Sequence, residues 1–122
     1  MIKEAYCSYE LSKLLKKNGF DEKVFTYYED EILKKGHWFE WNRSPLGHIA
    51  APTHQMAMKW LREVHNIFIE ISTSIDLNGD YHFSYTILDK ECKYVRKGYT
   101  DFDWNYEDAV EAAIKYALEN LI

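Results

Sequence analysis

The sequence contains few of the residues that build common small functional sites. Its two cysteines, Cys7 and Cys92, lie far apart and outside any CxxC pattern, so we expect neither a disulfide framework nor a zinc site. The five glycines are dispersed, which argues against a phosphate-cradling loop, and there is no GxSxG nucleophile motif. The sequence therefore indicates no metal, no cofactor and no class of enzyme.

Long apolar runs are also absent. No segment is long and apolar enough for a signal peptide or a membrane span, so the sequence predicts a cytoplasmic protein with reduced thiols and no membrane partner. The 122 residues, 47% of them hydrophobic, are enough for the core of a single domain that spans residues 1–122.

Positive charge is in the minority, with 15 Lys and Arg against 20 Asp and Glu and a net charge of −5. Such a chain gains little from counterion release on a polyphosphate, which disfavours general nucleic-acid binding. Aromatic residues, in contrast, make up 16% of the chain. This excess fits a sheet with a tyrosine-rich face, because aromatic residues favour strands and interfaces.

Three helices have recognisable ends. Residues 8–20 (SYELSKLLKKNGF) begin with Ser8 as the predicted N-cap, and Gly19 stops this helix with Phe20 folding back onto it. The second helix runs from the cap Thr53 to Asn66, and the third starts near Asn105. The inward-facing residues predicted for the second and third helices are Met56, Ala57, Trp60, Leu61, Val64, Val110, Ala113, Ile114, Ala117, Leu118 and Leu121.

Strands fill the intervals between these helices. Residues 23–30 and 36–42 are aromatic strand candidates, and their turn lies in the segment between them. Three further strands are predicted at 67–75, 81–89 and 93–102. Asn78-Gly79 predicts a type I′ turn between the first two of these. The order α-β-β-α-β-β-β-α predicts an α+β fold in which an antiparallel sheet has helices packed on one face.

The C-terminal part has the α-β-β-β-α order of a double-stranded-RNA-binding domain, a resemblance of topology only. Such domains bind phosphates through lysines at the start of the last helix. This chain has Glu107, Asp108 and Glu111 there, which would repel phosphate. A nucleic-acid-associated protein is the alternative reading of the chain. It would need a basic stripe on one face, formed by Lys13, Lys16, Lys17, Lys34, Lys35 and Arg43.

The histidines show no chelating spacing. His54 and His65 are separated along their helix by about 16 Å, too far to share a metal. His54 is the one histidine with a claim to function, because it lies at a helix N-terminus beside a loop. An enzyme of unrecognised type, the third reading, would need a pocket that holds His54, or Asp101 and Asp103, with perturbed pKa values.

The segment HWFEW, residues 37–41, places large aromatic side chains on both faces of its predicted strand. Unless both faces are covered, one of them presents an exposed aromatic patch, which is a natural place for a protein partner. The predicted partner-binding residues are Tyr27, Tyr28, Trp38, Trp41, Arg43 and His54.

Three segments carry a resemblance to a known family. SYELSKLLKKNGF, APTHQMAMKWLREVHNIFIEI and YEDAVEAAIKYALENLI together resemble a family of small uncharacterised proteins from gut anaerobic bacteria, often encoded in phage-like or mobile regions. The resemblance implies a compact cytoplasmic accessory protein, and it supplies no activity and no site residues. The leading hypothesis is therefore a non-catalytic interaction module that binds a protein partner or itself, with a homodimer as one form.

Overall fold

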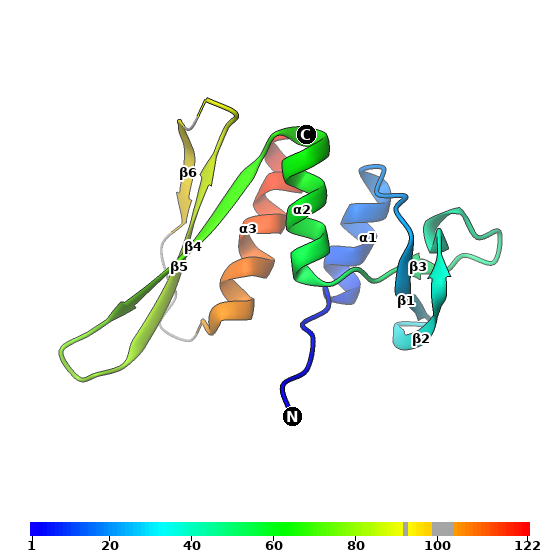
Figure 1. Ribbon diagram of the computed structural model, residues 1–122, viewed down its shortest axis with the longest axis horizontal. Helices are drawn as coiled ribbons and strands as arrows, with labels where there is room; N and C mark the ends of the chain where they lie inside the picture. Colours follow the sequence, from blue (N-terminus) through cyan, green and yellow to red (C-terminus); the bar gives the residue numbers. More distant parts are fainter. Residues whose placement is uncertain (92, 99–103) are drawn as a thin grey trace.

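The computed structural model describes residues 1–91, 93–98 and 104–122. Within these residues, three α-helices lie between two three-stranded antiparallel sheets (Figure 1). The elements in chain order are α1 (Tyr9–Lys17), β1 (Val24–Glu29), β2 (Ile32–Phe39), the 3-10 helix η1 (Trp41–Arg43), β3 (Ile49–Ala50), α2 (His54–His65), β4 (Phe68–Ile75), β5 (Tyr81–Leu88), β6 (Tyr94–Gly98) and α3 (Tyr106–Asn120). No helix in this described part is long and apolar enough to cross a membrane.

The α+β class and the predicted element order are confirmed, with β3 contributing only two residues. The aromatic hairpin does not join the C-terminal strands. It forms its own sheet in the order β2-β1-β3, and the other sheet has the order β4-β5-β6. Each sheet packs one face toward the helices (Figure 1). The predicted strand at 93–102 appears as β6, and its last four positions lie outside the described residues.

The helix ends form as their sequences predict. The Ser8 hydroxyl accepts a hydrogen bond from Leu11 N, and Gly19 has a φ of 92° at the end of α1. Asn66 stops α2 in the left-handed conformation, with a φ of 56°. These conformations depend on side-chain hydrogen bonds and backbone freedom within a few residues, so the local sequence is sufficient to specify them.

The turn between the two aromatic strands falls within the predicted segment, whereas the turn at Asn78-Gly79 differs in type. Asn78-Gly79 does not form a type I′ turn, since Gly79 has a positive φ but Asn78 does not. Instead the Asp76 carboxylate accepts hydrogen bonds from Asn78 N and Asp80 N across a longer loop. Positive φ at two consecutive residues occurs at Asp30 and Glu31, which join β1 to β2 with neither glycine nor asparagine.

One continuous core connects the three helices to both sheets. Its fully enclosed side chains include Leu15 and Phe20 from the first helical segment, Leu61 from α2, Ile87 from β5 and Ile114 from α3. The inward face predicted for α2 is confirmed at Ala57, Trp60 and Leu61 but is wrong at Val64, which is 53% exposed. Val64 is on the last turn of α2, beyond Leu61, the last buried residue of this helix.

Gly36 in β2 lies against the ring of Trp41. A Cβ atom at this position would approach Trp41 Cζ2 to 2.6 Å and Tyr27 Cε1 to 3.0 Å. We expect Gly36→Ala to destabilise the protein by about 1–3 kcal/mol, because a stacked pair of rings has to shift to admit a methyl group. Urea denaturation measures this. The control Lys35→Ala, at an exposed neighbour, is expected to change stability by about 0.5 kcal/mol or less; equal stability of the two variants would show that the rings yield freely.

Candidate functional site

The structure divides the predicted aromatic patch into a buried and an exposed part. Trp41 is only 8% exposed and stands in η1, not in a strand. Tyr27 is half-buried and stacks on Trp41 with ring centroids 4.1 Å apart. The Trp41 Nε1–H is directed at two carbonyl oxygens, Val24 O at 3.0 Å and His37 O at 3.2 Å. The expectation that Trp41 presents its ring to a partner is therefore corrected: the ring supports the small sheet from inside.

The other predicted partner residues also have roles within the fold. The half-buried Tyr28 donates its hydroxyl hydrogen to Cys7 O at 2.7 Å. Arg43 is exposed but forms ion pairs with Asp21 and Glu40. His54 is buried, with 6% of its surface exposed. Only Trp38 among the predicted residues is both strongly exposed and aromatic.

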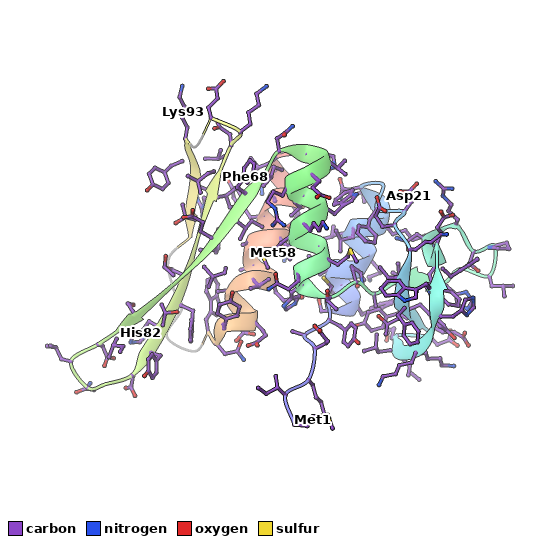
Figure 2. The ribbon with its side chains drawn as sticks, viewed as in Figure 1. Met1, Asp21, Met58, Phe68, His82 and Lys93 are labelled. Carbon is purple, nitrogen blue, oxygen red and sulfur yellow. The ribbon has the colours of Figure 1, made fainter. Side chains whose placement is uncertain are left out.

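Trp38 stands at the rim of an apolar cleft on the small sheet. Its ring is 62% exposed and meets the ring of Phe25 edge to face at a centroid distance of 6.1 Å. The adjoining cleft has a volume of about 400 Å³. Its lining residues are Glu4, Tyr6, Val24, Phe25, Thr26, Trp38, Ala51, Pro52, Thr53 and Met56. The cleft lies between β1 and the start of α2, since its lining combines residues of both elements; Figure 2 shows the side chains of this region.

The six basic residues of the alternative hypothesis do not form a free stripe. Lys13 pairs with Glu10, and Lys34 pairs with Glu29. Lys16 Nζ donates to the His48 carbonyl oxygen. With Arg43 held by two carboxylates, four of the six cations are engaged inside the molecule, which weakens the case for phosphate binding.

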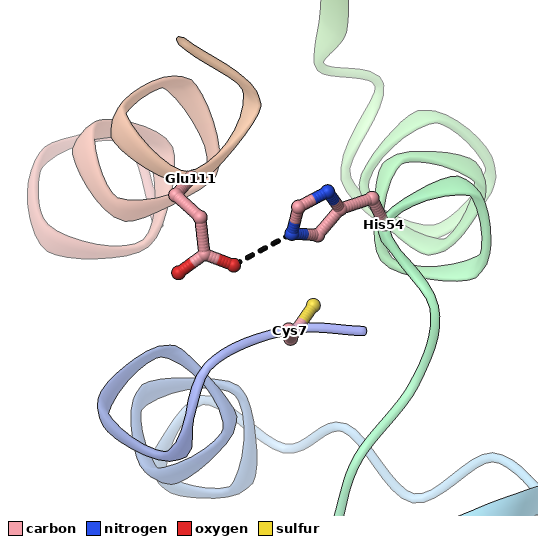
Figure 3. A group of neighbouring side chains, drawn as sticks. All are labelled: Cys7, His54 and Glu111. Atoms are coloured by element: carbon pink, nitrogen blue, oxygen red, sulfur yellow. Dashed lines mark hydrogen bonds and ion pairs between the residues drawn. The ribbon is translucent and has the colours of Figure 1, made fainter. Parts of the chain in front are cut away.

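A second cluster lies where α1, α2 and α3 meet. Cys7, which precedes α1, His54 at the start of α2 and Glu111 in α3 converge in Figure 3. His54 Nε2 lies 2.7 Å from Glu111 Oε2, and one potential ligand atom of each of the three residues lies within 4.8 Å of the others. Cys7 is fully buried, and the side chains of His54 and Glu111 are 7% and 27% exposed.

Hydrogen bonds hold each member of this cluster in place. Ser8 donates to both carboxylate oxygens of Glu111, through Oγ at 2.6 Å and through its backbone N at 3.1 Å. Cys7 N donates to Pro52 O, and His54 N donates to Ala5 O, both at 2.9 Å. The strand-like segment before α1 is thereby fixed to the start of α2.

Burial and charge shift the two acidic groups in opposite directions. Burial raises the pKa of the Cys7 thiol well above its usual value, and the charge of Glu111 raises it further. Burial alone would also raise the pKa of Glu111, but hydrogen bonds from His54 and Ser8 outweigh it and lower that pKa. At neutral pH Glu111 is therefore a carboxylate and Cys7 a neutral thiol.

This arrangement does not suit a cysteine nucleophile. A catalytic imidazole accepts the thiol proton on one nitrogen while a carboxylate holds the other. Here the carboxylate takes Nε2, and the second ring nitrogen of His54 points away from Cys7 in Figure 3. The raised thiol pKa also opposes thiolate formation. The described residues thus give this cluster no nucleophile geometry.

Sequence reasoning found His54 but not its neighbours. Cys7 and Glu111 are 104 positions apart in the sequence, and no short motif contains both. Only the packing of α1 and α3 against the start of α2 brings them together. The second cysteine, Cys92, and the candidate acidic pair, Asp101 and Asp103, lie outside the described residues. No family model, curated protein or solved structure significantly matches this chain.

Proposed function

We propose that the chain is a non-catalytic protein-interaction module whose partner inserts an apolar side chain into the cleft beside Trp38. The observation that supports this most strongly is a large aromatic ring, 62% exposed, at the mouth of an apolar cleft. Tryptophans that become desolvated on binding contribute a large share of the energy in protein interfaces. Single exposed apolar side chains are common on protein surfaces, but Trp38 contacts a second exposed ring, Phe25, and exposed apolar patches mark interaction surfaces.

The extent of the apolar surface favours a protein over a small molecule. Exposed apolar side chains continue along β2 beyond the cleft, with Ile32 60% and Leu33 40% exposed. A small ligand in the cleft would leave these residues in water. Ile32 and Leu33 point to opposite faces of β2, so a polypeptide that runs along this edge strand would cover one of them together with Trp38 and Phe25.

Charge indicates what the partner carries next to its apolar side chain. Glu4 is the one charged residue among the described residues that line the cleft. The chain as a whole has a net charge of −5. A partner with a basic residue beside its apolar anchor would complement both, whereas a second copy of the same chain would meet like charge.

Selection from a random peptide library displayed on phage tests this proposal. We expect selected peptides to share an aromatic or aliphatic residue next to Lys or Arg. We expect them to bind Trp38→Ala at least about tenfold more weakly than wild type, the loss of a typical interface tryptophan contact.

Tyr94→Ala is the matched control, because Tyr94 is also a strongly exposed aromatic residue but lies on β6 of the other sheet. Its affinity for the same peptides should equal that of wild type. Peptides that bind all three chains equally would contradict the proposal.

A further inference from the structure

The cluster of Cys7, His54 and Glu111 combines a thiol, an imidazole and a carboxylate, the three types of side chain that most often ligate zinc. We propose that these residues form a binding site for a thiophilic divalent cation, with Zn²⁺ as the preferred ion. The inference is independent of the Trp38 cleft and of any partner that binds there.

The three potential ligand atoms need only a small displacement to reach the spacing of zinc ligands. Bond lengths of about 2.3 Å for Zn–S and about 2.0–2.2 Å for Zn–N and Zn–O place tetrahedral ligand atoms roughly 3.3–3.6 Å apart. In the described structure the three atoms lie within 4.8 Å of one another, and His54 Nε2 lies 2.7 Å from Glu111 Oε2. A shift on the order of 1 Å, within the reach of side-chain rotation, brings them to the ligand spacing of a metal site.

Charge balance favours a divalent ion. Binding releases the proton of the Cys7 thiol to solvent. Nε2 of His54 gives up to solvent the hydrogen that it donates to Glu111, Nδ1 takes one from solvent, and Nε2 then holds the metal. The resulting thiolate and the Glu111 carboxylate carry two negative charges, which a 2+ ion neutralises in a place where an unpaired charge is costly. Thiolate and imidazole ligands select Zn²⁺ over Mg²⁺ and Ca²⁺, which prefer oxygen.

The surroundings already provide the second layer of a metal site. Ser8 donates to Glu111 from both its hydroxyl and its amide, and the Tyr28 hydroxyl donates to Cys7 O. Such contacts orient ligands before the ion arrives. These hydrogen bonds fix the ligands in place even though the three ligands come from distant parts of the sequence.

His54 and Glu111 border solvent, which can supply a fourth ligand, whereas Cys7 is fully buried. The described residues supply three ligands to this group. A cleft of about 670 Å³ borders it, and its lining includes Ser8, His54, Trp104 and Glu111. Three protein ligands with one open position are the arrangement of zinc sites that bind water or an exogenous ligand, rather than of closed structural sites.

Titration with Co²⁺ tests the site directly, since Co²⁺ replaces Zn²⁺ and reports its ligands in the absorption spectrum. The titration uses the whole chain with the substitution Cys92→Ser, which leaves Cys7 as the one thiol. We expect one equivalent of Co²⁺ to give a thiolate-to-cobalt charge-transfer band and the visible bands of a four-coordinate ion, both removed by one equivalent of Zn²⁺. Absence of the charge-transfer band at saturating Co²⁺ would overturn the proposal.

Variants assign the ligands. In the same background, Cys7→Ser should abolish the charge-transfer band, and Glu111→Gln should weaken Zn²⁺ binding by at least about 100-fold, the upper end of the loss seen for second-layer partners. His37→Gln, at an exposed histidine of β2, should bind as the parent does. Circular dichroism checks that each variant folds. If Cys7→Ser fails to fold, the charge-transfer band of the parent and the Zn²⁺ affinity of Glu111→Gln still test the site. A Zn²⁺ affinity of Glu111→Gln equal to that of the parent would overturn the assignment of Glu111 as a ligand.

Discussion

Trp41→Ala is expected to destabilise the protein by about 3–5 kcal/mol, the usual cost of removing a large buried aromatic ring. The ring is 8% exposed, stacks on Tyr27 and meets His48 edge to face. Its Nε1–H is also the donor to the Val24 carbonyl oxygen, which would lose that partner. Since these contacts join β1 to the loop after β2, we expect the small sheet to lose most of its order.

Trp38→Ala is the matched substitution, because it removes the same side chain three positions away. Trp38 is 62% exposed, so we expect a stability change of about 0.5 kcal/mol or less. Urea denaturation of both variants, followed by circular dichroism, gives the two values. Equal losses at the two positions would show that Trp41 is not the internal support of the small sheet.

Phe20→Ala is expected to have a similarly large effect, about 3–5 kcal/mol, through a cavity at the meeting point of the first two helices. Phe20 is 1% exposed and contacts the Trp60 ring at a centroid distance of 5.3 Å. Its backbone N donates to Leu15 O at 2.9 Å, which closes the end of α1. The substitution keeps this backbone bond, so the measured loss reports the side chain.

Phe25→Ala serves as the comparison for Phe20→Ala. Phe25 lies on β1, the central strand of the small sheet, but it is 43% exposed and meets the Trp38 ring edge to face, so about 1 kcal/mol or less is expected. Thermal unfolding of the two variants measures the difference. A Phe20→Ala protein as stable as Phe25→Ala would mean that the core repacks around the lost ring.

The features predicted correctly from the sequence are those that a few neighbouring residues decide. Ser8, Thr53 and Asn105 cap helices because each side-chain oxygen accepts a hydrogen bond from the backbone N–H three residues later. Asn66 adopts the left-handed conformation that its side chain tolerates. The apolar spacing of α3 likewise follows from helical geometry alone.

The features missed depend on how whole strands and helices pair and pack, which a few neighbouring residues do not decide. Asp30 and Glu31 adopt positive φ because the pairing of β1 with β2 requires a two-residue connection, whatever residues occupy it. The sequence pattern predicts Trp41 as a strand residue with an exposed face, but in the structure η1 directs its ring inward. The neighbours of His54 emerge only from the packing of three helices. Membership in a family from phage-like regions stays a prediction from resemblance.

The footprint of a selected peptide on the chain tests the central proposal most directly. Amide proton–nitrogen correlation spectra, recorded as the highest-affinity peptide is added, locate the residues whose surroundings change. We expect the largest shifts at Tyr6, Phe25 and Trp38, including the Trp38 indole N–H, and none on β6. A footprint confined to β6 or α3, with the Trp38 indole unmoved, would contradict the assignment of this cleft as the interaction site.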